Sequence, residues 1–299
     1  MNRILIVGCG DIALRVASLL RTRYRLFGLL RNPMRCAELR AAGIVPLPGD
    51  LDDPHSLHRL SGLAHTVLHF APPAAAVGES AVTDARTRNL IAALSRGSLP
   101  QRLIYISTSG VYGDCHGAVV PETCPIHAQS PRAKLRVDAE NRIRNWAKHN
   151  GVQASILRVP GIYAAERLPL ERLKKGTPAI MDAEDGYTNH IHADDLAHSV
   201  IAALRHAKPN RVYHTSDDSQ MKMGEYFDAV ADAFDLPHAP RVTRVDAQRV
   251  LTPMLLSFMN ESRRLTNTRM KKELKVSMRY PTVAHALEEI SLAEVRPRG

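Results

Sequence analysis

A short apolar strand runs directly into a Gly-x-Gly-x-x-Ala turn at residues 3–13, near the start of the sequence. Gly8 permits the tight turn, and Gly10 has no Cβ to keep a pyrophosphate away from the backbone. Asp11 and Ile12 then begin a predicted helix whose N-terminal N–H groups face the phosphates. Glycine pairs also mark ordinary strand-to-helix turns, but the apolar strand before this pair and the apolar helix face after it favour a dinucleotide site.

Apolar, β-branched runs alternate with helical stripes over the first two thirds of the chain. This alternation is typical of a parallel sheet with helices on both faces. We therefore predict an α/β fold, a doubly wound parallel sheet of the Rossmann type with a small C-terminal substrate lobe. Residues 1–160 are assigned to the NAD(P)-binding domain, and 161–299 to a mixed region that holds the lobe and elements returning to the sheet. The predicted strands are residues 4–7, 25–30, 43–47, 66–70, 103–107, 154–159 and 211–215, and the clearest predicted helices are 12–21, 34–42, 83–95, 132–149 and 193–207.

An arginine ends the second predicted strand, where an NAD-binding chain usually carries an acidic residue. A carboxylate there holds the ribose 2′-hydroxyl, whereas the guanidinium of Arg31 suits the 2′-phosphate of NADP. Asn32 and Arg35 follow in the same loop and are predicted to contact the cofactor too. We therefore predict NADP, with NAD as the alternative, because Arg31 could also be a solvated arginine at a strand end.

Two further segments follow the third and fourth predicted strands, Gly-Asp-Leu-Asp-Asp at 49–53 and His-Phe-Ala-Pro-Pro at 69–73. Here the chain resembles the short-chain dehydrogenase/reductases in their extended and atypical branches, which include nucleotide-sugar epimerases and dehydratases. The resemblance implies that Asp50 and Leu51 contact the adenine, and that Phe70, Ala71 and Pro72 line the cofactor. Alternatively, Asp50 is a charge that favours the N-terminus of the following helix.

The resemblance covers nearly the whole chain, with its motifs in the family's order. Residues 106–113 are similar to a segment whose second hydroxyl residue, here Thr108, hydrogen-bonds the reacting oxygen of the substrate. A threonine at a strand end can equally cap a turn. Residues 157–163 are similar to the stretch beside the nicotinamide, which implies a cofactor contact by Pro160. Residues 191–197 and 262–281 resemble two further motifs of the family.

The chain departs from the family at its usual proton donor. Family members use a Tyr and a Lys one helical turn apart, but this sequence contains no Tyr-x-x-x-Lys. When Glu140 is aligned with the acidic residue that follows this pair, Arg132 takes the Tyr position and Arg136 the Lys position. Because a guanidinium stays protonated, Arg132 cannot act as the general acid or base. Arg136 either holds the cofactor ribose or an anionic substrate group, or is a solvated arginine, and Tyr112 beside a cation is a candidate acid.

These residues predict an NADP-dependent oxidoreductase or epimerase that acts on a nucleotide-sugar-like or other hydroxyl or carbonyl substrate. Its predicted catalytic residues are Thr108, Tyr112 and Arg136. The missing Tyr and Lys favour a second hypothesis, a non-catalytic NADP-sensing regulatory protein on the same fold. A homodimer through the helices at 83–95 and 132–149 stays open, because family members often pair there but these helices carry several arginines.

The charge balance does not point to a macromolecular partner. Lys and Arg number 40 against 30 Asp and Glu, a formal net charge of +10, but the basic residues are scattered and only 5% of residues are aromatic. Nucleic-acid binding is therefore not favoured. No apolar run approaches the roughly 20 residues that cross a bilayer, and we expect a cytoplasmic protein. Cysteines and histidines at 115–127 match no compact zinc motif, so no metal is expected.

Overall fold

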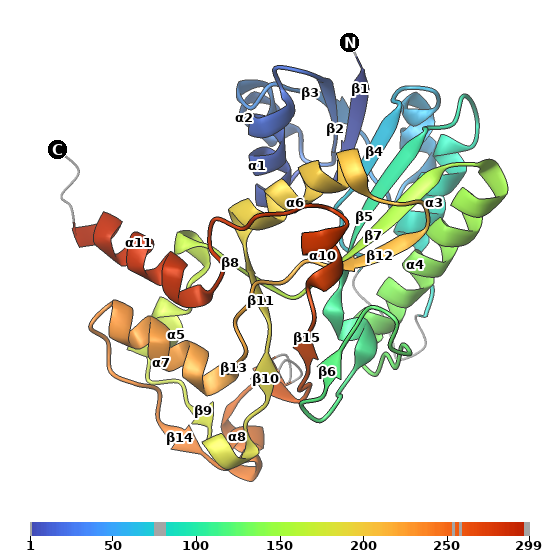
Figure 1. Ribbon diagram of the computed structural model, residues 1–299. Coiled ribbons are helices and arrows are strands. Elements are labelled where there is room, and N and C mark those ends of the chain that lie inside the picture. The colour runs from blue at the N-terminus through green and yellow to red at the C-terminus, as the bar shows by residue number, and fades with distance from the viewer. Residues whose placement is uncertain (1, 75–81, 253–254, 257–258, 296–299) are drawn as a thin grey trace.

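A seven-stranded parallel sheet forms the centre of the molecule, in the order β12-β7-β5-β4-β1-β2-β3 (Figure 1). The structure, a computed structural model, describes residues 2–74, 82–252, 255–256 and 259–295. The strands of the sheet are β1 (Arg3–Val7), β2 (Arg25–Leu30), β3 (Ile44–Pro48), β4 (Thr66–His69), β5 (Arg102–Thr108), β7 (Gln153–Val159) and β12 (Arg211–His214). The helices connecting them are α1 (Asp11–Leu20), α2 (Cys36–Ala41), α3 (Ala85–Leu94), α4 (Pro131–Asn150) and α6 (Ala193–His206).

Both faces of this sheet are apolar because helices cover both of them. Along β1, Ile4 and Ile6 belong to the hydrophobic core that includes α1 and α6. Leu5 and Val7 belong to the core on the opposite face, with α3 and α4. Successive side chains of a strand point to opposite faces, so a strand buried on both faces reads as the continuous apolar run seen in the sequence.

The C-terminal part of the chain adds a lobe with a core of its own, below the sheet in Figure 1. This core joins residues of a helix pair, α7 and α11, to short strands and the helices α5 and α8. The strands and helices outside the central sheet and its connecting helices include β6 (Val119–Val120), β8 (Gly161–Tyr163), α5 (Leu170–Lys174), β9 (Ala179–Ile180), β10 (Tyr187–Thr188), β11 (His190–His192), β13 (Met221–Lys222), α7 (Met223–Ala233), β14 (Arg241–Val242), α8 (Arg244–Val250), β15 (Arg264–Leu265), α10 (Thr268–Lys272) and α11 (Val283–Val295).

The fold class and all seven predicted strands are confirmed, and the five predicted helices appear with shifted ends. The helix predicted at 34–42 begins as a 3₁₀ turn, Pro33–Arg35, because the Asn32 side chain accepts the N–H of Met34 and Pro33 takes the first position. The short strand pairs of the lobe were not predicted. The division of the chain at residue 160 and the homodimer stay predictions.

The carboxyl ends of β1 and β4 meet where the strand order reverses direction. The carbonyl oxygen of Val7 accepts the backbone N–H of Phe70 at 2.7 Å and that of Ala71 at 2.9 Å. Gly8 follows with a φ of +97°, a conformation that favours glycine. Ligands of open α/β sheets bind in the crevice at such a reversal, so this junction positions the site.

We expect Gly8→Ala to lower the free energy of unfolding by about 2 kcal/mol or more, as measured by urea denaturation. A Cβ at Gly8 would stand 2.3 Å from the backbone nitrogen of Ala71, in addition to the strain of the positive φ. Gly10→Ala is the matched control, because a Cβ there has no atom within 4 Å. Equal stability of the two variants would show that the junction tolerates a side chain.

Candidate functional site

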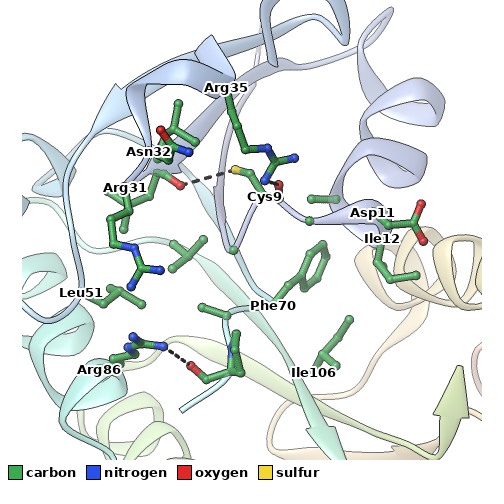
Figure 2. Close-up of a pocket in the computed structure, with 18 of the residues that line it drawn as sticks. Cys9, Asp11, Ile12, Arg31, Asn32, Arg35, Leu51, Phe70, Arg86 and Ile106 are labelled. Atoms are coloured by element: carbon green, nitrogen blue, oxygen red, sulfur yellow. Dashed lines mark hydrogen bonds between the residues drawn. The ribbon is translucent and has the colours of Figure 1, made fainter. Parts of the chain in front are cut away.

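A cavity of about 790 Å³ lies along the carboxyl edge of the central sheet (Figure 2). It takes in the turn after β1 and the loops after β2, β3 and β4. The cofactor residues predicted from the sequence that line it are Gly8, Gly10, Asp11, Ile12, Arg31, Asn32, Arg35, Asp50, Leu51, Phe70, Ala71 and Pro72. Arg136 lines it as well, whereas Pro160, Thr108 and Tyr112 are outside its lining.

The N-terminus of α1 is open toward this cavity. Its N-cap, Gly10, has no side chain to accept the first N–H groups of the helix. A Cβ on Gly10 would project into space with no atom within 4 Å. Unpaired N–H groups at the positive end of a helix attract anions. The residues present therefore fit the pyrophosphate of a dinucleotide.

Three arginines reach the half of the cavity formed by β2 and β3, and two of them have carboxylate partners. Arg35 donates to Glu38 at 2.7 and 2.9 Å and to the carbonyl oxygen of Cys9 at 2.8 Å. Arg86 donates to both oxygens of Asp52, at 2.9 and 2.6 Å. Arg31 is exposed and extends toward the same space in Figure 2. It forms no ion pair with any residue in the described part of the chain.

Hydrogen bonds within the turn at Asp50 stabilise the loop after β3. The Asp50 carboxylate accepts the backbone N–H of Asp52 at 3.0 Å, and Ser56 Oγ accepts the backbone N–H of Asp50 at 2.8 Å. The cap of the following 3₁₀ helix is Asp53, whose side chain accepts the N–H of His55. Asp50 therefore does not cap that helix, and its adenine contact stays a prediction.

On the opposite half of the cavity, α4 presents Arg136 four residues after Arg132. Arg136 is only 6% exposed, and its Nη1 donates to the Tyr105 hydroxyl at 3.0 Å and to the carbonyl oxygen of Ile106 at 2.7 Å. Arg132 is exposed. Burial thus distinguishes the two arginines, because Arg136 is part of the cavity wall and not a solvated side chain, whereas Arg132 is exposed.

Tyr112 lies in a buried polar network instead of on the cavity wall. Its hydroxyl accepts from Arg158 Nη1 at 2.6 Å and is 2.6 Å from His214 Nε2. Burial lowers the pKa of His214 to about 3, so the ring is neutral. Its Nδ1 donates a hydrogen bond to the carbonyl oxygen of Thr266, and its Nε2 accepts a hydrogen bond from the Tyr112 hydroxyl. Burial also raises the pKa of Tyr112 to about 12, in spite of Arg158. Arg158 is itself paired with buried Glu140 at 2.7 Å.

Thr108 ends β5 and caps the turn that follows it. Its Oγ1 accepts the backbone N–H of Gly110 at 3.2 Å. The hydroxyl can still donate its proton while it accepts this bond. The substrate contact of Thr108 and the acid role of Tyr112 therefore stay predictions.

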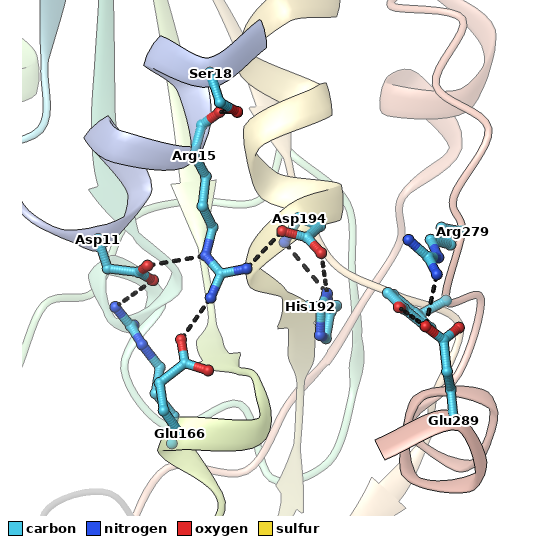
Figure 3. Close-up of polar contacts among 10 residues, drawn as sticks. Asp11, Arg15, Ser18, Glu166, His192, Asp194, Arg279 and Glu289 are labelled. Carbon is cyan, nitrogen blue, oxygen red and sulfur yellow. Dashed lines mark hydrogen bonds and ion pairs between the residues drawn. The ribbon is translucent and has the colours of Figure 1, made fainter. Parts of the chain in front are cut away.

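An ion-pair cluster joins the start of α1 to the lobe (Figure 3). Arg15 donates to Asp11 at 2.9 Å, to Asp194 at 2.6 Å and to Glu166 at 2.5 Å. Arg167 donates to the second oxygen of Asp11 at 2.9 Å. Asp11, the acidic residue beside the glycine turn, is thus ion-paired with both Arg15 and Arg167.

A second group of buried polar side chains lies behind the site, in the lobe. Asp217 is 4% exposed; one of its oxygens accepts the N–H of Ser219 at 2.9 Å, and the other has no partner in the described residues. The Tyr163 hydroxyl and His190 Nδ1 are likewise unpartnered there. Burial raises the pKa of Asp217 to about 7 and lowers that of His190 to about 3.

The sequence analysis missed several residues of the cavity wall, among them Arg86, Ile106, Ile162 and Arg167. Ile106 and Ile162 lie within the segments 106–113 and 157–163 but were given no role, whereas Arg86 and Arg167 belong to no motif and reach the cavity only through the packing of α3 and the lobe. Among the described residues no three His, Cys, Asp or Glu side chains are grouped to hold a metal ion. Within the same residues no helix is long and apolar enough to cross a membrane.

Comparisons with known proteins agree with this architecture. The model of the NAD dependent epimerase/dehydratase family matches residues 5–215. GDP-6-deoxy-D-mannose reductase of Pseudomonas aeruginosa is 23% identical over 249 residues, which cover 77% of this chain and 80% of the relative.

Two solved structures align with nearly all of the chain. A conserved protein of unknown function from Silicibacter pomeroyi is 27% identical, with a TM-score of 0.80 over 98% of this chain and 99% of its own. A dTDP-glucose 4,6-dehydratase from Streptomyces venezuelae, solved with NAD and TYD bound, is 20% identical with a TM-score of 0.79. Its alignment covers 99% of this chain and 98% of its own. The last likeness bears on the fold alone.

We expect the free energy of unfolding of Asp217→Asn to rise more steeply between pH 5 and 7 than that of wild type, in which buried Asp217 opposes the rise caused by the buried neutral histidines His190 and His214. The folded pKa of Asp217, about 7, lies above the unfolded value near 3.9. Its stabilising contribution is therefore complete below about pH 4 and is lost as the pH rises through 7. Urea denaturation across this range measures the slope. Asp235→Asn, at an exposed carboxylate with no ion pair in the described residues, should keep the wild-type slope, and an equal slope in Asp217→Asn would contradict the assignment.

Proposed function

Because the chain belongs to the NAD-dependent epimerase/dehydratase family, we propose that it binds NADP in the cavity and performs a redox step on a hydroxyl or carbonyl substrate. The open N-terminus of α1 beside Gly10 is the observation that carries this proposal. When bound, NADP supplies a nicotinamide that accepts or donates a hydride. A nucleotide-sugar-like substrate is proposed by analogy with the relatives, whose names state sugar nucleotides.

Each part of the proposed cofactor site has a specific task. The first N–H groups of α1 hold the pyrophosphate, because they combine unpaired donors with the positive end of the helix. Asp50 and Leu51 bind the adenine at the β3 end. The remaining proposed contacts are Asn32 and Arg35 near the ribose and Phe70, Ala71, Pro72 and Pro160 along the cofactor.

Arg31 is proposed to select NADP over NAD. It lines the cavity and has no carboxylate partner among the described residues, whereas Arg35 and Arg86 are both paired. A guanidinium binds a phosphate through two parallel hydrogen bonds, and a carboxylate in its place would repel it. The 2′-phosphate of NADP is the group that matches this free cation.

On the substrate side, the Thr108 hydroxyl is proposed to donate a hydrogen bond to the reacting oxygen while it accepts one from the backbone N–H of Gly110. Tyr112 is proposed as the proton source, a role that requires its buried hydroxyl to release the hydrogen bond that it donates to His214. Its hydroxyl is held between Arg158 and His214, and Arg158 opposes the rise of the tyrosine pKa that burial causes. Arg136 is proposed as the fixed positive charge of the site.

A non-catalytic NADP-binding regulator is the second candidate. The observation that favours it is the absence of a Tyr-x-x-x-Lys pair from the sequence. Both candidates use the same cofactor cavity, and they differ in whether the bound cofactor is consumed. Turnover, and not cofactor binding, therefore separates them.

We expect Arg31→Asp to weaken NADPH binding at least tenfold and to leave NADH binding within about threefold of wild type, because only NADPH loses a charge-assisted hydrogen bond. Fluorescence titration of each reduced cofactor measures both affinities. Arg40→Asp is the matched control, since this exposed arginine of α2 does not line the cavity. The assignment is wrong if wild type binds both cofactors equally or if Arg31→Asp tightens NADPH binding.

We expect Thr108→Ala to lower kcat about a hundredfold, the usual effect of removing one hydrogen-bond donor to a reacting oxygen. Oxidation of NADPH with a panel of carbonyl and nucleotide-sugar substrates measures this. Thr108→Ser should retain most activity, and Arg132→Ala should behave as wild type because Arg132 is exposed. A protein that binds NADPH and oxidises it with no member of the panel would favour the regulator.

A further inference from the structure

Five arginines line the cavity, and they differ in how their charge is balanced. Those with carboxylate partners are Arg35 with Glu38, Arg86 with Asp52 and Arg167 with Asp11. The other two, Arg31 and Arg136, form no ion pair within the described residues. Water solvates the exposed Arg31, but Arg136 is only 6% exposed. Arg136 is therefore a buried cation without a counter-ion.

The hydrogen bonds of Arg136 use only part of its guanidinium. Nη1 donates to two neutral oxygens, those of Tyr105 and Ile106. Nε is buried with no partner in the described part of the chain. Nε and Nη2 lie on one edge of the guanidinium and form a fork that matches the two oxygens of a carboxylate. Within the described residues no group accepts a hydrogen bond from this edge.

No carboxylate forms an ion pair with Arg136 in the described residues. Buried Asp84, whose charge acts on Tyr105, accepts hydrogen bonds from Thr87. Glu140, one helical turn later, is fully engaged, because its two oxygens accept from Ser107 and Arg158. His69 is neutral, since burial together with the Arg136 charge lowers its pKa to about 3. The Tyr105 phenol is protonated, because burial raises its pKa to about 12. A buried charge is costly unless it is paired, so this arrangement requires an anion from outside the chain.

We propose that Arg136 binds a carboxylate of the substrate through Nε and Nη2, and that the substrate class is a hydroxy or oxo acid, sugar acids included. The proposal rests on the proposed function in one respect: the cavity also holds NADP. The cofactor phosphates then bind at the N-terminus of α1 and at Arg31, and the substrate carboxylate binds at α4.

The cofactor itself does not satisfy this site. A ribose hydroxyl could accept from Nε, but it is neutral and leaves the buried charge unbalanced. The pyrophosphate has the N-terminus of α1, and the 2′-phosphate has Arg31, on the other half of the sheet. The substrate is the remaining source of negative charge.

Calorimetric titration of the NADP-saturated protein with malonate, at constant ionic strength, tests this assignment. Malonamide is the uncharged counterpart and inorganic phosphate the second anion. We expect wild type to bind malonate at least tenfold more tightly than malonamide or phosphate. Arg136→Gln should lose at least tenfold in malonate affinity, and Arg136→Lys should retain part of it. Arg132→Gln, an exposed arginine of the same helix, should bind malonate as wild type does.

The NADPH affinity of the same preparations distinguishes failure of this proposal from failure of the proposed function. Wild type that binds NADPH but not malonate overturns this proposal and leaves the proposed function standing. If Arg136→Gln weakens NADPH at least tenfold without changing malonate binding, Arg136 holds the cofactor and the proposal is wrong. Phosphate that binds as tightly as malonate overturns the substrate class. Wild type that binds neither reduced cofactor refutes the proposed function, and the malonate titrations of the cofactor-free variants then decide the role of Arg136.

Discussion

One carbonyl oxygen holds together the two halves of the sheet at the site. The Val7 oxygen accepts the N–H groups of both Phe70 and Ala71, so the ends of β1 and β4 approach so closely that only glycine fits at position 8. That approach aims the following turn, and with it the N-terminus of α1, at the crevice where the strand order reverses. The tight junction therefore forms one wall of the cavity, which Gly8, Phe70 and Ala71 line.

The charges around α1 show how such a site is kept attractive to an anion. Asp11 is the first residue of the helix, and its carboxylate would oppose a phosphate placed beside it. Arg15 and Arg167 neutralise that carboxylate, and Arg15 also reaches Asp194 and Glu166 (Figure 3). The dipole of α1 is then left to act on the ligand, and the same ion pairs fasten the helix to the lobe that faces it.

Local sequence signals predicted the strands and the glycine turn, because each depends on neighbours a few positions away. The residues assigned to the cofactor line the cavity, apart from Pro160, and their contacts stay predictions. The cap at Asn32 is also local, yet it was overlooked, and the helix after it was placed too early. The Arg86 contact with Asp52 spans 34 positions and that of Tyr112 with His214 spans 102. Such pairs depend on how helices and loops pack, and no pattern in the sequence encodes which arginine remains unpaired.

If Arg132 and Arg136 take the positions of the missing Tyr and Lys, as the alignment through Glu140 predicts, the electrostatics of the site change. A lysine that assists a tyrosine can titrate, whereas the guanidinium of Arg136 keeps its charge at every pH at which the protein is folded. On our proposal the affinity of Arg136 for an anionic substrate is then independent of pH. On the proposed function Tyr112 is the proton source, and burial raises its pKa to about 12, so its hydroxyl stays protonated between Arg158 and the neutral His214.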